Sequence, residues 1–380
     1  MTARLPLDAL GASSVSLPSR TAENAALGIN GKSGDQKAFR NWRRSAYGDT
    51  RKAAKLLMGK DEKLSLSLHN CNWSGFEDYV GLHRSLETGR ASFSGLQTCK
   101  KVWLCPCCSA RISWLRKLEL DTLLAWARSQ GYFVKLLTLT ASHKRGDALA
   151  PLLASLKGAK KRLRERREWR ALPLVGSVTA TEVTHGANSF HPHFHEILIF
   201  RENVDLSPLL PVWLKCLSGF GLSGNERALH SQNADAAGDY IAKFGAAEEL
   251  TLTGSKDGRG KSSRSPWQLL ADSGVDDPQA SAAWIEYALA IKGARQLVWS
   301  RGLKALSGVD DVTDDDISDP VSEKELLAVW QSRGLWKEAR PYRASLLEAA
   351  ETGRCLDTVQ RGSTDLEVQE ALSPSGSVFE

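Results

Sequence analysis

The chain has 380 residues, of which 50 are Lys or Arg, 44 are Asp or Glu and 42% are hydrophobic. These values are typical of a folded protein of roughly two to three domains, and they exclude a wholly disordered or collagen-like chain. No apolar run approaches the ~18 residues of a membrane span, and the N-terminal segment lacks the apolar stretch of a secretory signal. We therefore expect a cytoplasmic protein with no membrane partner.

The charges are unevenly distributed along the chain. Residues 1–300 carry 41 basic and 28 acidic side chains, whereas residues 301–380 carry 9 basic and 16 acidic ones. A basic body is typical of proteins that bind a polyanion, most often nucleic acid. A solvated helix face with an acidic, solubilising tail would have the same composition, so charge alone leaves both interpretations open.

The composition divides the chain into four segments. Residues 1–60 are basic and rich in small residues, which predicts a partly disordered arm with one helix near AFRNWRRSAY. A Cys-rich segment and a helix follow at 61–130, and a domain with several predicted strands occupies 131–304. Residues 305–380 form an acidic extension, in which we expect a linker at 311–320 and a helical region at 322–352.

Five of the seven cysteines fall within 38 residues. The odd number of cysteines and the missing secretory signal argue against a disulfide framework. Cys99, Cys105 and Cys108 have a spacing that suits a structural Zn²⁺ site, and a single C-x-x-C pair is otherwise compatible with buried structural thiols. The fourth ligand could be Cys107, His83 or Cys71.

The next elements predict an α+β fold with an antiparallel sheet flanked by helices. ISWLRKLELDTLLAWARSQ, at 112–130, has the apolar spacing of an amphipathic helix, and YFVKLLTLT, at 132–140, that of a buried strand. A helix is expected at 151–170. Two strands, LVGSVTATEVT and HFHEILIF, follow on either side of a turn at 186–189, and SAAWIEYALAIKG is helical.

The helix at 151–170 ends in a strongly basic stretch. Residues 157–170 contain eight basic and two acidic side chains. Such a stretch can bind DNA phosphates, or it can simply be a solvated helix face. The candidate DNA-contacting residues are Lys160, Lys161, Arg162, Arg164, Arg166 and Arg167.

The second hairpin strand begins with three histidines at alternating positions, in HPHFHEILIF. Side chains alternate between the two faces of a strand, so His193 and His195 share a face and can bind one divalent ion. A turn centred between residues 187 and 188 would place Glu182 opposite His193 and on the same face. Glu182 is therefore the expected third ligand and His191 the alternative, whereas packed or surface histidines remain the simpler interpretation.

A short helix is expected at 234–244, in ADAAGDYIAKF. Tyr240 and Lys243 lie three residues apart and so share a helix face. A phenol becomes a feasible nucleophile toward phosphorus when a metal polarises the phosphate and an ammonium group is near. A tyrosine that anchors an amphipathic helix is the alternative.

These motifs resemble those of a known family. LLTLT at 136–140, HPHFHEILIF at 191–200 and DYIAKF at 239–244 have the order and approximate spacing of the three motifs of plasmid rolling-circle replication initiators, which are HUH endonucleases. QTCKKVWLCPCCSARISWLRKLEL is similar to the Cys-rich segment that precedes these motifs in many such initiators. The resemblance covers about residues 97–304.

The resemblance implies an HUH nuclease core at 131–304 and a function. His193 and His195 match the pair that binds Mg²⁺ or Mn²⁺, Tyr240 the nucleophile that nicks one strand at the double-strand origin, and Lys243 the lysine after it. The enzyme would keep a covalent 5′-phosphotyrosine, leave a 3′-hydroxyl primer and later rejoin strands, with a host helicase and DNA polymerase as expected partners. Ala236 stands where some relatives carry the glutamate used at termination.

Two other functions remain open at this stage. A transposase or conjugative relaxase of the same superfamily would use the same chemistry for another task. A zinc-stabilised, non-catalytic DNA-binding regulator would explain the cysteines and the basic charge, but it gives no reason for HPHFH upstream of a Tyr-x-x-Lys pair. Substitution of Tyr240 separates a nickase from such a regulator.

Overall fold

The computed structural model describes residues 33–233, 263–274, 277–310 and 324–354. Within them the fold is α+β with antiparallel sheets, as the sequence predicts. The strands expected at 132–140, 174–184 and 193–200 are all present. None of the described helices is both long and apolar enough to cross a membrane.

The larger sheet among the described residues has the strand order β6-β3-β5-β4-β7, and β8 pairs with another part of β4. Every pairing in it is antiparallel. The long hairpin of β4 and β5 forms its centre. Its strands are β3 (Phe133–Leu139), β4 (Leu174–Gly186), β5 (Ser189–Phe200), β6 (Leu229–Asn233), β7 (Ser263–Arg264) and β8 (Leu297–Trp299).

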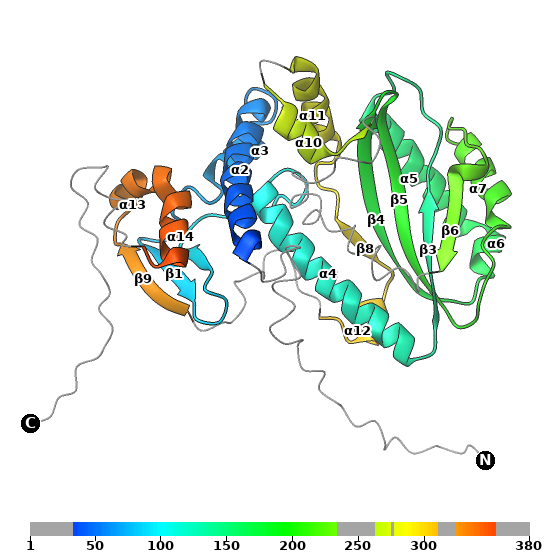
Figure 1. The fold of residues 1–380 in the computed structure, drawn as a ribbon. Helices are drawn as coiled ribbons and strands as arrows, with labels where there is room; N and C mark the ends of the chain where they lie inside the picture. Colours follow the sequence, from blue (N-terminus) through cyan, green and yellow to red (C-terminus); the bar gives the residue numbers. More distant parts are fainter. Residues whose placement is uncertain (1–32, 234–262, 275–276, 311–323, 355–380) are drawn as a thin grey trace, which may run out of the picture.

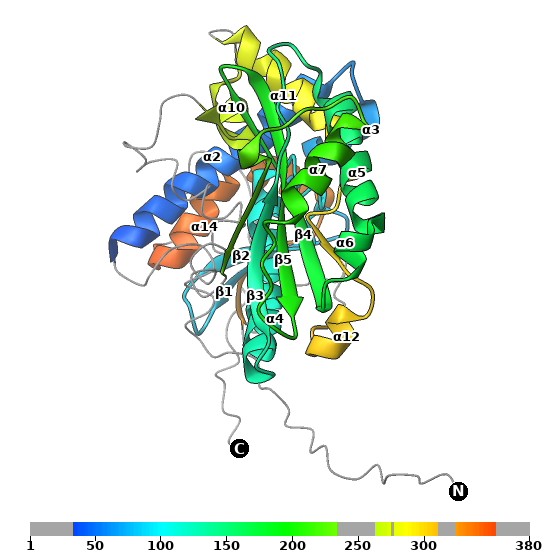
Figure 2. The same ribbon diagram turned by 90° about the vertical axis from the view of Figure 1, so that its right-hand side faces the viewer.

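Helices cover both faces of this sheet (Figures 1 and 2). Alternate residues of β5 point to opposite faces, and both faces carry apolar side chains that the helices bury. Phe194 and Leu198 pack with one set of helices, whereas Ile197 and Ile199 pack with another. The first set is α5 (Leu149–Glu165), α6 (Arg167–Arg170) and α7 (Leu209–Ser218); the second is α4 (Pro106–Ser129) and α12 (Leu303–Ser307).

A smaller unit lies on the other side of α4 (Figure 1). Its sheet has the order β2-β1-β9, so a strand from near the end of the described chain pairs with an early one. The unit comprises α2 (Ser33–Leu57), α3 (Glu62–Asn70), β1 (Val80–Ser85), β2 (Ala91–Ser94), β9 (Lys324–Trp330), α13 (Arg333–Ala339) and α14 (Arg343–Thr352).

Two further helices connect the smaller unit with the larger sheet. α10 (Pro266–Asp272) packs against α2, and α11 (Pro278–Ala290) packs against both α2 and α5. The fully buried Trp284 of α11 belongs to a core that also contains Leu57 of α2 and Leu149 of α5. The two units therefore share buried apolar residues.

Two element predictions are wrong. The region expected to be helical at 322–352 begins with β9, a strand that is completed by pairing with β1 rather than by a local periodicity. The single helix expected at 151–170 is broken at Arg166, whose ψ of 149° is extended and ends α5 before α6 begins.

Candidate metal centres

The β4–β5 hairpin has the register that its sequence predicts. Gly186 pairs with Ser189 across a two-residue turn, and Glu182 lies opposite His193. Ser189 adopts a positive φ of 72°, which lets the chain reverse tightly. Since directly opposed residues share a face, Glu182, His193 and His195 all project from the same side of the sheet.

The three side chains converge on one point. The Nε2 atoms of His193 and His195 lie 3.1 and 2.9 Å from the same carboxylate oxygen of Glu182. One donor atom from each of the three residues lies within 4.8 Å of the others. Ligand atoms about 2.0–2.2 Å from a shared ion are separated by distances of this size. Two imidazoles and one carboxylate could therefore hold a divalent metal ion.

The hydrogen bond of His193 to the main chain leaves the other ring nitrogen, Nε2, free to bind a metal ion. Nδ1 lies 3.3 Å from the carbonyl oxygen of His191, which can only accept, so Nδ1 carries the hydrogen. In the neutral ring, Nε2 then presents a lone pair toward Glu182. Two acceptors at 3.1 Å need a cation between them, and that cation is either a proton or a metal ion.

A threonine on the neighbouring strand orients His195. Thr138 of β3 is paired with His195, and its Oγ1 lies 3.0 Å from Nδ1 of that ring. A hydrogen bond at one imidazole nitrogen fixes the ring and directs the other nitrogen toward the metal. Thr138 was not among the predicted site residues. The alternation of side chains along the strand at 132–140 is the signal that could have placed it on the same face as His195.

His191 lies outside the three-residue group. Its Nε2 is 3.2 Å from Oγ1 of Thr140, and its Nδ1 is 3.3 Å from Nδ1 of His143. Burial, followed by the nearby His193 and His143 rings, lowers the pKa of His191 to about 4. The structure thus pairs His191 with His143 and leaves Glu182 as the third member of the group.

Glu182 is in the charge state that a metal ligand requires. Burial raises the pKa of this carboxyl, but the hydrogen bonds with His193 and His195 outweigh burial, and the net pKa lies well below the usual range. The side chain is 43% exposed, whereas His193 and His195 are largely covered. The carboxylate is therefore ionised at neutral pH and accessible from solvent.

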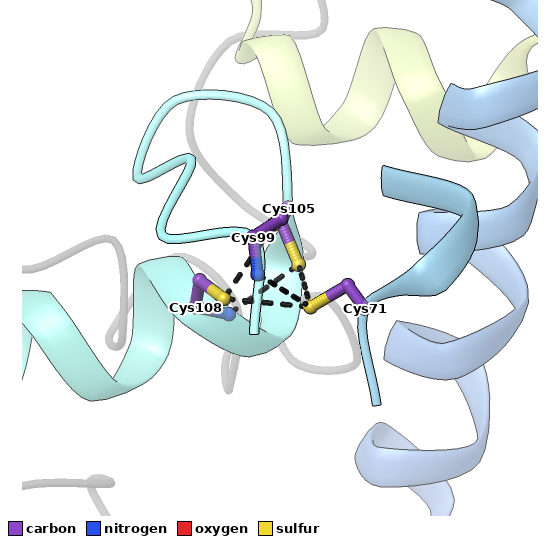
Figure 3. Close-up of side chains that lie close together, drawn as sticks. All are labelled: Cys71, Cys99, Cys105 and Cys108. Atoms are coloured by element: carbon purple, nitrogen blue, oxygen red, sulfur yellow. Dashed lines mark hydrogen bonds between the residues drawn. The ribbon is translucent and has the colours of Figure 1, made fainter. Parts of the chain in front are cut away.

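A second group of ligands is formed by four cysteines, which Figure 3 shows pointing toward one another. Sγ of Cys71 lies 3.7 Å from that of Cys105 and 3.6 Å from that of Cys108, and Cys99 lies 3.6 Å from Cys108. A tetrahedron with Zn–S bonds of about 2.3 Å has edges of about 3.8 Å. A disulfide would need about 2.05 Å. The four thiols therefore have the dimensions of a tetrahedral zinc site.

The backbone around these cysteines bends to present the sulfur atoms. Asn72 and Lys100, each directly after a cysteine of the group, have positive φ values of 48° and 54°. Such values are uncommon outside glycine and cluster at ligand sites. Cys105 caps α4, and its sulfur accepts the N–H of Cys108 at 3.5 Å.

Of the three alternatives for the fourth ligand, the structure selects Cys71. Cys107, which the sequence analysis included among the zinc ligands, lies outside the group of four and has Thr50 Oγ1 3.7 Å from its sulfur. His83 is hydrogen bonded to Ser94 within the smaller sheet. The reason is geometric: Cys107 follows Cys105 by two residues on α4 and so points in another direction.

The basic stretch has two kinds of residue. Lys160 Nζ and Arg164 Nη2 each lie 2.8 Å from the carboxylate of Glu196, which is fully buried in β5. We therefore correct their expected role: they neutralise a buried carboxylate instead of facing DNA. Lys161, Arg162 and Arg167 are exposed, and Arg166 is half-buried, so these four remain available for phosphate contacts.

Tyr240 and Lys243, together with Ala236, lie outside the described residues.

Comparison with known proteins covers the Glu182–His193–His195 group and three of the four cysteines. Residues 91–204 match the family described as replication protein. This segment contains Cys99, Cys105 and Cys108 as well as the whole β4–β5 hairpin. The comparison confirms the predicted resemblance of the chain to plasmid replication initiators.

Two curated proteins are similar over longer or shorter stretches. Protein rep of Streptomyces lividans is 25% identical over an alignment of 311 residues. The match covers 60% of this chain and 68% of that protein. A protein of Streptomyces cyanogenus described as neomycin resistance protein is 28% identical over 141 residues, or 29% of this chain and 32% of its own length. No solved structure matches the chain.

Proposed function

We propose that the protein is a metal-dependent DNA nickase that initiates plasmid rolling-circle replication. The convergence of His193, His195 and Glu182 on one point of a sheet hairpin carries the proposal. The match of that hairpin to the replication protein family supports it. In this proposal residues 131–304 are a nicking domain of the HUH type.

Each residue has a stated task in this reaction. Glu182, His193 and His195 would hold Mg²⁺ or Mn²⁺, which supplies polarisation of the scissile phosphate when bound. The Tyr240 oxygen attacks phosphorus, the bond from phosphorus to the 3′-oxygen breaks, and the strand leaves with a free 3′-hydroxyl. Lys243 stabilises the phenolate that attacks.

The covalent product explains how the same site can rejoin strands. The phosphotyrosine bond retains the energy of the phosphodiester, so attack by a 3′-hydroxyl reverses the reaction without ATP. Host DNA polymerase would extend the first 3′-hydroxyl, and a host helicase would separate the strands. The exposed residues Lys161, Arg162 and Arg167 would contact phosphates beside the nick, and the Cys71–Cys99–Cys105–Cys108 group would hold a structural Zn²⁺.

A covalent-adduct assay tests the proposal. The purified protein is incubated with Mn²⁺ and single-stranded oligonucleotides that tile a plasmid origin and are labelled at the 3′ end, which stays with the covalent adduct, and the products are separated on a denaturing gel. We expect a slow, protease-sensitive labelled band with the unsubstituted chain and none with Tyr240→Phe or His193→Ala. An equally strong band with Tyr240→Phe would refute the assigned nucleophile, and DNA binding without any adduct would favour a non-catalytic regulator.

A further inference from the structure

Trp73, in the connection between α3 and β1, has three guanidinium groups against its indole ring. The Cζ atoms of Arg51, Arg340 and Arg343 lie 3.6, 4.6 and 4.6 Å from the ring centroid. Arg51 belongs to α2, whereas Arg340 and Arg343 lie at the junction of α13 and α14. We call these four residues the arginine–tryptophan cluster.

Two of the three guanidinium groups donate to carbonyl oxygens, and within the described part of the chain none of the three forms an ion pair with a carboxylate. Arg51 donates to the carbonyl oxygen of His69 at 2.7 Å, and Arg343 donates to that of Arg340 at 3.2 Å. Burial, followed by repulsion from Arg343 and Arg340, lowers the pKa of Arg51 to about 10, so the group stays positive at neutral pH. The cluster thus concentrates charge that an anion would stabilise.

Two exposed aromatic side chains lie close in the sequence to residues of the cluster. Phe76, three residues after Trp73, is 55% exposed, and Tyr342, between two of the arginines, is 41% exposed. Arg333 adds a further cation there, because its Nη2 donates to the carbonyl oxygen of Phe76 at 3.5 Å. Cations interleaved with accessible rings suit an unpaired nucleic-acid strand, whose phosphates bind the cations and whose bases stack on the rings.

We propose that the arginine–tryptophan cluster, with Phe76 and Tyr342, forms a second DNA-binding surface that holds an unpaired strand. This surface belongs to the smaller unit and is separate from the β4–β5 hairpin of the larger sheet (Figure 1). The identity of the polyanion as DNA rests on the proposed function.

The nearby cysteines suggest another role that the test must distinguish. The thiol groups of Cys71 and Cys107 interact electrostatically with Arg343, so the arginines could serve only to stabilise thiolates at the zinc site. In that case their loss would release zinc and leave contacts with DNA unchanged. Zinc content is therefore measured beside DNA binding.

The variant Arg51→Gln/Arg340→Gln removes two partly exposed charges and leaves the buried Arg343 in place. Arg128→Gln is the matched control, since Arg128 is exposed in the last turn of α4, away from the cluster. Binding of the full-length chain to a labelled mixed-sequence single strand is measured by fluorescence anisotropy between about 50 and 200 mM KCl. The same strand annealed to its complement provides the duplex comparison.

The slope of log K against log salt concentration is negative. We expect its magnitude on the single strand to be smaller by about 1.4 in the double variant, which corresponds to roughly 0.7 per lost phosphate contact. Arg128→Gln should leave the slope unchanged, and the double variant should retain its zinc. The proposal would be overturned if the double variant kept the slope of the unsubstituted chain, if it lost its zinc, or if its slope changed as much on the duplex as on the single strand. Because this binding is not covalent, a failure of the Tyr240 adduct would count against the nickase alone.

Discussion

Thr138 and Thr140 are two residues apart on and just after β3, yet they support different histidines. Thr138 contacts His195 of the metal-binding group, whereas Thr140 contacts His191 outside it. Removal of a hydrogen bond that orients a metal ligand typically costs 10–100-fold in affinity. The pair therefore distinguishes the proposed metal ligands from a histidine that only lies close to them.

We predict that Thr138→Val weakens Mn²⁺ binding about 10–100-fold and that Thr140→Val leaves it nearly unchanged. Valine keeps the shape of threonine and removes only the hydroxyl. Isothermal titration of each variant with Mn²⁺ measures the difference. A stronger effect of Thr140→Val would show that His191, not Glu182, completes the site.

Cys71 and Cys107 give a second matched pair at this scale. Cys71 lies within hydrogen-bonding distance of two other thiols of the group, whereas Cys107 has Thr50 beside it. A tetrahedral zinc site that loses one thiolate loses much of its affinity. We predict that Cys71→Ser reduces bound zinc to well below one ion per chain and lowers Tm, while Cys107→Ser keeps both. Inductively coupled plasma mass spectrometry gives the stoichiometry, and equal zinc loss in the two variants would be evidence for Cys107 as a ligand.

Among the elements, α5 is attached to the hairpin by an internal ion-pair network. Glu196 lies on the face of β5 opposite His195, and it is bound by Lys160 and Arg164 of α5. Oγ1 of Thr179 donates to the same carboxylate at 3.2 Å. The strand that carries the proposed metal ligands His193 and His195 is thus fixed on its opposite face by ion pairs with a helix.

Loss of the Glu196 charge should destabilise the protein strongly. Glu196→Gln leaves two partly buried cations without their carboxylate, which typically costs about 3–5 kcal/mol. Glu165→Gln is the control, because Glu165 is exposed and 4.0 Å from Arg162, and it should change the free energy of unfolding by less than about 0.5 kcal/mol. Urea unfolding measures both. Equal effects of the two substitutions would refute the structural role of the network.

The same network predicts an acid dependence. Burial raises the pKa of Glu196, but Lys160 and Arg164 lower it more, so the folded-state pKa lies below the ordinary value. The stabilisation is therefore complete above the unfolded pKa of about 4.3 and is lost as the pH falls below it. The stability difference between the unsubstituted chain and Glu196→Gln should shrink in that range.

The elements whose partners are local are predictable from the sequence. The β4–β5 hairpin depends on one turn and on period-two alternation, so residue spacing was enough to place Glu182 opposite His193. The basic stretch, in contrast, has the pattern of a surface helix. Period 3.6 correctly puts Lys160 and Arg164 on one side, but the buried acid that they meet belongs to a distant strand and is not visible in the helix itself.

For the whole molecule, the unpredicted features are those that join distant parts of the chain. The sequence of β9 is predicted to be part of a helical extension, and its pairing with β1 is what makes it a strand. The arginine–tryptophan cluster likewise combines residue 51, residue 73 and residues 340–343, so no single segment contains its pattern. Cys71 was one of three alternatives for the fourth ligand, and the fold decides among them by bringing its sulfur to the other three.

The pairing of β1 with β9 has a consequence for synthesis on the ribosome. Val80 cannot pair with Trp330 until the chain between them has been synthesised. That takes roughly 10–50 s at 5–20 residues per second. During that interval the edge of β1 that β9 will cover is unpaired and open to contacts with other chains. A product that stops before residue 324 never closes this edge. We therefore expect prematurely terminated chains to be selectively bound by chaperones or degraded, so that the cell retains mainly chains that carry β9.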